Sequence, residues 1–370
     1  MKFIPVIGDP FHLSHQNRFL SRFKGHKNKE SGEKSKLAFS TGIYTSRSPV
    51  KPPGYDNEDS YCVDKNHICV ADGVGGWITQ GISSAMYSRE LIRNVDENLK
   101  LIRSSKRKMG KEEFIEIINN SYEKTKSSKL IGSSTLSIVL MDSSNKLHVF
   151  NLGDSKCLIY RMSERSVIYE SDIQQHDFNI PYQLGTGSFD KPKDGQYSVF
   201  ENVKIGDTII LATDGLWDNL STEQIIDIFE HNLGLDPQII AEKIGQRALR
   251  SSLNLSYVSP YSVCIGEFLP SKSSNSSSLN RNGDCNITVT STVFNNGKRT
   301  SSSNIGCGKG ELNIKGFNYN ANTNSYLSNR NNIGDSNHDN CFYSNFFGGK
   351  PDDITVTIGI INRDASEVHQ

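Results

Sequence analysis

The chain has 370 residues, of which 35 % are hydrophobic, and its 41 basic residues balance its 41 acidic residues. This neutral balance argues against a nucleic-acid-binding protein and against an acidic tail. No apolar run approaches the roughly 20 residues that a membrane-spanning helix needs, so no membrane span is expected. The low hydrophobic content indicates that part of the chain does not pack into a core.

The first 36 residues are polar and basic, with no acidic residue between Asp9 and Glu30. Such an Arg-rich, acid-poor segment is typical of a mitochondrial-type presequence, and a solvated basic tail is the other interpretation. The segment lacks the apolar stretch of a secretory signal. We therefore expect an intracellular protein, and the choice between the cytoplasm and a mitochondrial-type organelle stays open.

The folded region is expected to begin near Leu37. Density of β-branched and apolar residues predicts most of its strands. Apolar steps of three and four residues predict a helix whose buried face runs from Ala85 and Met86 to Ile102, and a second helix over 111–126. The strands are predicted at 67–72, 133–141, 146–152, 156–162, 166–170, 206–213 and 354–361.

Two further helices are predicted before residue 253. Ser221 and Gln224 have the spacing of a capping box, which indicates a helix through His231. Pro237 then stands at the tolerated first position of a helix that runs to about Ser252. Because helices interrupt runs of closely spaced strands, the pattern favours an α+β fold with largely antiparallel sheets.

Residues 271–346 have a different composition, since 18 of these 76 residues are Asn and 14 are Ser. Such a segment buries too little apolar surface to offset its chain entropy, so we predict a disordered insertion. The strand predicted at 354–361 follows it, which places the insertion inside one domain that spans 37–362. Residues 363–370 are expected to form a C-terminal tail.

Seven cysteines are present. Their odd number and the lack of a C-x-x-C pair indicate neither a disulfide framework nor a zinc site. Cys62, Cys69, Cys157 and Cys264 lie in strand-like runs. We expect them to be small core residues in a reducing compartment, with redox sensing as the alternative.

Four acidic motifs are spread over nearly three hundred residues, and three of them adjoin a predicted buried strand. Strand ends lie at the rim of a core, so the four motifs can converge on one point. Several carboxylates cannot share a dry site without a compensating charge. Oxygen ligands select Mg²⁺ or Mn²⁺, and a pair of such ions can hold a hydroxide and clamp a phosphoryl group. The motifs are Asn57-Glu58-Asp59, Ala71-Asp72-Gly73-Val74-Gly75-Gly76, Thr213-Asp214-Gly215-Leu216-Trp217-Asp218 and Pro351-Asp352-Asp353-Ile354-Thr355.

These motifs, with Asn151-Leu152-Gly153-Asp154-Ser155 between them, resemble in order the metal-dependent Ser/Thr protein phosphatases, the PPM or type 2C family. The segment 171–179 is similar to the compact branch that includes mitochondrial matrix phosphatases. The resemblance covers about 37–269 and 347–362. It implies an αββα sandwich of two antiparallel sheets flanked by helix pairs, with a binuclear metal cleft at one end.

The resemblance also implies roles for single residues. The implied reaction is hydrolysis of phosphoserine and phosphothreonine in a protein by a hydroxide that bridges two Mg²⁺ or Mn²⁺ ions. Asp72, Asp214 and Asp352 carry this catalysis through the metals. By the resemblance, Asp72 bridges both ions. The first ion is also bound by Asp214 and Asp352, and the second ion by the Gly73 carbonyl, Glu58 and Asp59. A candidate weak third ion is bound by Asp154 and Asp218, and Asp353 orients the ligands.

Two departures from the family pattern leave alternatives open. Many relatives carry a His after the Asp-Gly pair as a general acid, where this chain has Val74. Many also carry a phosphate-binding Arg shortly before the Glu-Asp pair, where Gly54, Tyr55 and Asp56 stand here. The alternatives are a pseudophosphatase that binds partner proteins and a phosphatase of small phosphoesters. A monomer is expected in each case.

Overall fold

The computed structural model describes residues 36–103, 109–273, 293–295, 298–300 and 347–364. The chain divides into two units, and each is considered by itself. The first unit unites the chain up to Leu249 with the chain from Pro351 onward, and the second is Arg250–Lys350.

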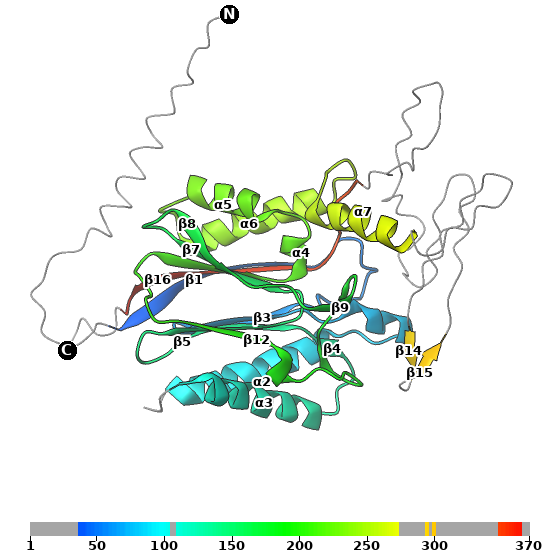
Figure 1. The fold of residues 1–370 in the computed structure, drawn as a ribbon, viewed down its shortest axis with the longest axis horizontal. Helices are drawn as coiled ribbons and strands as arrows, with labels where there is room; N and C mark the ends of the chain where they lie inside the picture. The colour runs from blue at the N-terminus through cyan, green and yellow to red at the C-terminus, as the bar shows by residue number, and fades with distance from the viewer. Residues whose placement is uncertain (1–35, 104–108, 274–292, 296–297, 301–346, 365–370) are drawn as a thin grey trace, which may run out of the picture. The chain divides into compact units, whose positions relative to one another are not determined.

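The first unit contains two five-stranded antiparallel sheets (Figure 1). In the first sheet the order is β1 (Leu37–Ser46), β16 (Ile354–Arg363), β13 (Asp207–Ala212), β7 (Lys156–Arg161) and β8 (Ser166–Glu170). In the second sheet the order is β12 (Gln196–Phe200), β6 (Leu147–Leu152), β5 (Leu136–Met141), β3 (His67–Ala71) and β2 (Ser60–Val63).

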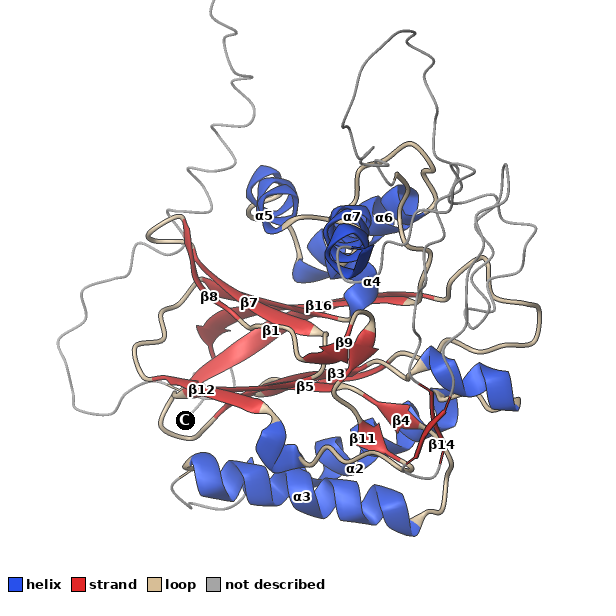
Figure 2. Cartoon of the chain, turned by 45° about the vertical axis from the view of Figure 1, so that its right-hand side comes forward, coloured by secondary structure: helices blue, strands red, loops and turns tan. Residues whose placement is uncertain are grey.

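Three apolar cores hold four layers together. Between the sheets, residues such as Val70 of β3 and Ile209 of β13 pack face to face. The outer face of the second sheet packs on α2 (Ala85–Arg103) and α3 (Lys111–Ser127). The outer face of the first sheet packs on α4 (Asp214–Trp217), α5 (Thr222–His231) and α6 (Pro237–Ser252). Figure 2 shows the resulting helix–sheet–sheet–helix order, which confirms the predicted αββα sandwich.

The strands that precede the acidic motifs are buried along their whole length. All five residues of β3 and all six of β13 are buried, because each strand lies inside its sheet and carries apolar residues on both faces. A carboxylate directly after such a strand is therefore held at the edge of the core. Short pieces complete the unit: η1 (Gly75–Gln80), β4 (Ser133–Ser134) with β11 (Leu184–Gly185), β9 (Gln175–Asp177) with β10 (Ile180–Pro181), and η2 (Pro192–Asp194).

The second unit contains α7 (Pro260–Ser273) and a hairpin of β14 (Val293–Asn295) and β15 (Lys298–Thr300). Val258 forms a bridge with Gly348, and the Ser259 hydroxyl donates a hydrogen bond to the Gly348 carbonyl at 2.7 Å. The two ends of the segment between residues 259 and 348 therefore lie next to each other. The rest of the predicted insertion 271–346, like residues 1–35 and 365–370, lies outside the described residues.

Most predicted elements are found, with boundary shifts of one to three residues. The capping box is confirmed, since the Ser221 amide donates to the Gln224 side chain at 3.0 Å and the Gln224 amide donates to the Ser221 hydroxyl at 3.4 Å. The prediction that Met86 lies on the buried face of α2 is wrong, because its side chain is 58 % exposed. Strands β1, β2 and β12 and helix α7 are not among the predicted elements.

No helix in the described part of the chain is both long enough and apolar enough to cross a membrane.

Candidate metal centre

Three aspartates from distant parts of the chain meet at one end of the sandwich. Asp72 directly follows β3, and Asp154 lies in the turn between β6 and β7. Asp214 begins α4 and is separated from the end of β13 only by Thr213. One carboxylate oxygen from each lies within 4.8 Å of the other two, a spacing at which they can hold a metal ion. We call these three residues the aspartate cluster.

The backbone around Asp72 is fixed by the neighbouring strand. Its amide donates a hydrogen bond to the Thr135 hydroxyl at 3.0 Å, and the Thr135 amide donates to the Asp72 carbonyl at 2.9 Å. A side chain at Gly73 would place its Cβ 2.7 Å from the Glu58 carbonyl oxygen and 2.9 Å from the Ser84 Cβ. Only glycine therefore fits here, which holds the first two acidic motifs against each other.

Asp214 and Asp154 are held by different means. A Cβ at Gly215 would lie 2.0 Å from the Asp353 carbonyl oxygen, so the absence of a side chain lets α4 approach the fourth acidic motif. The Gln175 amide group donates to Asp154 Oδ2 at 2.9 Å. Both aspartates are less than a tenth exposed. Asp218 is half-buried, and its amide donates to the Asp214 carbonyl at 2.8 Å.

Asp59 and Asp352 lie beside the aspartate cluster. The Thr213 hydroxyl donates to Asp59 Oδ2 at 2.8 Å. The other oxygen of Asp59, Oδ1, is buried and has no hydrogen-bond partner among the described residues. Asp352 is half-buried and accepts a hydrogen bond from the Asp353 amide at 2.8 Å.

Burial and neighbouring negative charges together disfavour ionised carboxylates in this region. Desolvation, followed by the negative charges of Asp214 and Asp59, raises the pKa of Asp72 well above its usual range. Desolvation, followed by the charge of Asp353, likewise raises the pKa of Asp59. A raised carboxyl pKa means that the ionised form is disfavoured, and a bound cation would remove that penalty. The unpartnered Asp59 oxygen and the all-oxygen donors thus fit a hard divalent metal.

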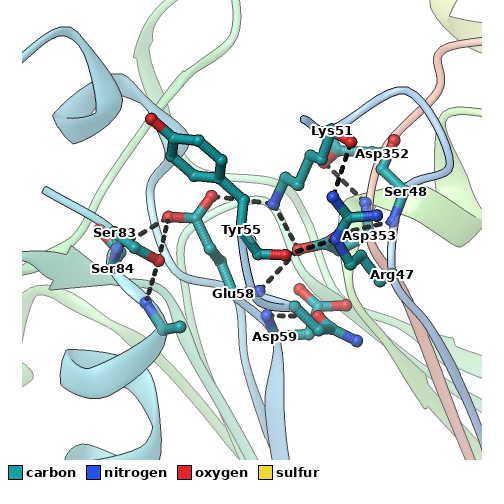
Figure 3. Close-up of polar contacts among 12 residues, drawn as sticks. Arg47, Ser48, Lys51, Tyr55, Glu58, Asp59, Ser83, Ser84, Asp352 and Asp353 are labelled. Carbon is teal, nitrogen blue, oxygen red and sulfur yellow. Dashed lines mark hydrogen bonds and ion pairs between the residues drawn. The ribbon is translucent and has the colours of Figure 1, made fainter. Parts of the chain in front are cut away.

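Two further carboxylates, Glu58 and Asp353, are the sequence neighbours of Asp59 and Asp352 and are already paired with a cation. The Lys51 ammonium lies 2.8 Å from Glu58 Oε2 and 2.5 Å from Asp353 Oδ2 (Figure 3). Asp353 also accepts hydrogen bonds from the amides of Ser48 at 2.7 Å and of Glu58 at 2.6 Å. Burial opposes the charge on Lys51, yet Asp353 and Glu58 raise its pKa. We call Lys51, Glu58 and Asp353 the lysine cluster.

The structure places Glu58 in this lysine cluster rather than in the aspartate cluster. Its Oε1 accepts hydrogen bonds from the Ser84 amide at 2.7 Å and from the Ser83 hydroxyl at 3.2 Å, at the start of α2. Both carboxylate oxygens of Glu58 are therefore engaged within the chain. A direct bond from Glu58 to a metal would require Lys51 to move.

Sequence reasoning did not find Lys51 and Arg47. The Arg47 guanidinium donates to the carbonyls of Lys51, Pro52 and Tyr55, so it shapes the loop that carries Lys51. The expected phosphate-binding arginine was sought only at residues 54–56. A search for any basic residue in the longer loop before Glu58 would have found both cations.

The family described as "Protein phosphatase 2C" matches residues 202–254. A Xenopus laevis relative, "Protein phosphatase PTC7 homolog", is 31 % identical over 259 residues, which are 65 % of this chain and 84 % of the relative. The chain belongs to the protein phosphatase 2C family. The yeast family member "Protein phosphatase 2C homolog 7, mitochondrial" is 31 % identical over 57 % of this chain and 68 % of its own length.

The fold agrees with this membership in the protein phosphatase 2C family. The crystal structure of the photosystem II phosphatase PBCP superposes with a TM-score of 0.60 at 20 % identity, over 88 % of this chain and all of that one. The chain spans about half the length of two Arabidopsis thaliana family members, 55 % of probable protein phosphatase 2C 80 and 46 % of probable protein phosphatase 2C 55.

Proposed function

We propose that this chain is a Mg²⁺- or Mn²⁺-dependent phosphatase of phosphoserine and phosphothreonine in proteins. The observation that carries the proposal is the aspartate cluster, in which three carboxylates converge within 4.8 Å. Burial, and then the charges of neighbouring aspartates, raise the pKa of Asp72 there. Oxygen ligands favour Mg²⁺ and Mn²⁺ over softer metals. Membership in the protein phosphatase 2C family supports the same reaction.

The proposed ligand assignment follows the positions of the carboxylates. Asp72 would bridge two ions, with Asp214 and Asp352 on one and the Gly73 carbonyl and Asp59 on the other. Glu58 would reach the second ion through water while it stays paired with Lys51. Asp154 lies close enough to Asp72 and Asp214 to share their metal, and with Asp218 it would hold a weak third.

The metals would supply Lewis acidity and a water nucleophile that is acidic enough to react at neutral pH. The chain itself supplies orientation. Thr213 positions the Asp59 carboxylate, Thr135 fixes the backbone of Asp72, and Asp353 fixes the amides of Ser48 and Glu58. Val74 carries no proton to donate, so we propose that the leaving oxygen is protonated by a group other than residue 74.

Lys51 is the candidate cation for the phosphoryl group. Its side chain is 16 % exposed, so the ammonium is partly accessible from solvent while it bonds to Glu58 and Asp353. A charged donor at this point would neutralise phosphoryl oxygen charge that the missing arginine leaves unmatched. We propose this role in place of the arginine expected from the family resemblance.

The test is phosphate release from a phosphothreonine peptide by the full chain, with Mn²⁺ and with excess EDTA. Turnover that needs Mn²⁺ supports the proposal, and full turnover in EDTA would falsify it. A sugar phosphate measured in parallel identifies a small-molecule phosphatase if it is the better substrate. Peptide binding without turnover at any Mn²⁺ concentration would identify a pseudophosphatase.

We further propose a phosphoprotein substrate, a monomeric state and an intracellular location. The mitochondrial designation of the yeast relative supports a mitochondrial-type organelle as the compartment. Imaging of the tagged chain with and without residues 1–36 tests this proposal, because a presequence must be needed for import.

A further inference from the structure

A second cluster of metal-ligand side chains lies on the outer face of the hairpin β2–β3. Cys62 of β2 pairs directly with Cys69 of β3, so both side chains point to the same face of the sheet. His67 is two residues before Cys69 and shares that face. Helix α2 covers it and contributes Asp96. We call Cys62, His67 and Asp96 the thiol cluster.

The three side chains are already close enough to share one ion. The sulfur of Cys62, a ring nitrogen of His67 and a carboxylate oxygen of Asp96 all lie within 4.8 Å of one another. His67 Nε2 is 2.9 Å from Asp96 Oδ1, and Asp96 Oδ2 is 2.7 Å from the Lys100 ammonium.

His67 has a polar atom that the fold does not satisfy. The residue is completely buried, and its Nδ1 has no hydrogen-bond partner in the described part of the chain. Buried polar atoms are nearly always paired, so an unpaired ring nitrogen beside a thiol needs an explanation. A ligand that binds at the thiol cluster and turns the ring would provide one.

The Cys62 thiol ionises more readily than the buried Cys157 thiol. Hydrogen bonding to Cys69 lowers the pKa of Cys62 to about 7, although burial opposes the shift. Burial raises the pKa of Cys157, which has no such neighbours. Thiolate is the form of cysteine that binds metals, so Cys62 is available as a ligand near neutral pH.

We propose that Cys62, His67 and Asp96 bind one Zn²⁺-type cation, at a site separate from the aspartate cluster. Thiolate sulfur, imidazole nitrogen and carboxylate oxygen are the three ligand types of zinc sites, and water completes four-fold coordination. One thiolate and one carboxylate balance the charge of a divalent ion. Thiolate selects against Mg²⁺, so the two sites sort metals by ligand chemistry.

The position of the site suggests what the ion stabilises. Strand β2 begins directly after Asp59, and β3 ends directly before Asp72. An ion that joins both strands to α2 would fix the spacing of these two aspartates. Its contribution is therefore structural, and it requires no change in the chemistry at the aspartate cluster.

The experiment is a titration of the reduced, metal-free full chain with Co²⁺, followed by the near-ultraviolet absorption of thiolate-to-cobalt charge transfer. The aspartate cluster contains no sulfur, so only a cysteine site gives this signal. We expect one equivalent of Co²⁺ to saturate the band and Zn²⁺ to displace it. Cys62→Ser should abolish the band. Asp96→Asn should raise the Kd for Co²⁺ by at least the roughly 10–100-fold that the loss of an outer-shell partner costs, because Asp96 is a direct ligand in this proposal.

Three controls make the result specific. Cys157→Ser removes a buried thiol outside the cluster and should leave the band unchanged. Replacing Cys264, Cys285, Cys307 and Cys341 together by Ser should also preserve it. Asp214→Asn should retain the band while phosphatase activity is lost, which separates this proposal from the proposed function. No band at stoichiometric Co²⁺, or a band that survives Cys62→Ser, would overturn the proposal.

Discussion

The aspartate cluster and the lysine cluster are neighbouring groups of carboxylates whose negative charge is treated in opposite ways by the chain. In the lysine cluster, Lys51 lies within 2.8 Å of both Glu58 and Asp353, and the chain neutralises its own charge. In the aspartate cluster, Asp72, Asp154 and Asp214 converge with the charges of Asp59 and Asp352 nearby.

The difference separates two roles for carboxylates. A carboxylate that is paired within the chain is a rigid support, because its position is set by its partners. A carboxylate whose pKa is raised by burial and by neighbouring charges is destabilised in its ionised form, and an external cation that binds there relieves this penalty. Removing a charge should therefore have opposite effects on stability in the two clusters.

The largest expected effect is the loss of turnover in the aspartate cluster. Asp72→Asn and Asp214→Asn should each lower kcat by at least about 10³-fold, equivalent to some 4 kcal/mol, because each displaces a metal that activates the nucleophile. In EDTA their Tm should stay level or rise, since like-charge repulsion is relieved. Initial rates and thermal unfolding measure both. Asp172→Asn, at an exposed aspartate outside the cluster, is the matched control. Near wild-type turnover in Asp72→Asn would refute the assignment.

The next expected effect is a loss of stability on removing a charge from the lysine cluster, opposite in sign to the change expected in the aspartate cluster. Lys51→Met leaves Glu58 and Asp353 without their cation, so the free energy of unfolding in EDTA should fall by about 3 kcal/mol. Lys51→Arg, which keeps the charge, should lose less. Urea unfolding at pH 7 measures the difference. If Lys51→Met proved as stable as the wild type, charge compensation by Lys51 would not support the fold.

Asp142 lies in neither cluster, and hydrogen bonds stabilise its ionised form. Burial opposes the shift, yet His148 and the amides of Lys146 and Ser144 lower the pKa of Asp142 to about 2. A lowered pKa gives stability that is present above the unfolded-state pKa of about 4 and is lost as the pH falls toward 2. Asp142→Asn should therefore lower the free energy of unfolding by about 2 kcal/mol at pH 7.

The pH dependence distinguishes this effect from packing. The deficit of Asp142→Asn relative to the wild type should shrink between pH 4 and pH 2, where the wild-type carboxylate is itself protonated. Chemical unfolding across that range provides the measurement. A deficit that is constant with pH would assign the loss to side-chain packing.

The smallest expected effect concerns the proton for the leaving oxygen. The backbone of Val74 is held by hydrogen bonds with Ser133 and Ser84, so a new side chain there should not shift the loop. Val74→His should raise the rate by less than about tenfold on phosphoesters with poor leaving groups, and less on good ones, because general acid catalysis matters most for poor leaving groups. Equal changes for both substrate types would indicate that residue 74 has no access to the reaction.

By itself the sequence determined the order of most helices and strands and the place of two of the aspartates. Buried strands such as β3 and β13 carry apolar residues on both faces, and an aspartate stands one residue after β3 and two residues after β13. This short-range pattern sufficed to put Asp72 and Asp214 at the edge of the core. The capping box at Ser221 is likewise a local signal and was predicted correctly.

Only the tertiary structure decided which charges meet. Lys51 and Asp353 are 302 positions apart, and their contact arises because β1 and β16 pair along their whole length. Cys62, His67 and Asp96 meet because a hairpin and a helix pack face to face, although their sequence spacing resembles no metal motif. Helix and strand periodicities are local properties of the chain, whereas the partner of a charge is set by contacts between segments that the sequence separates.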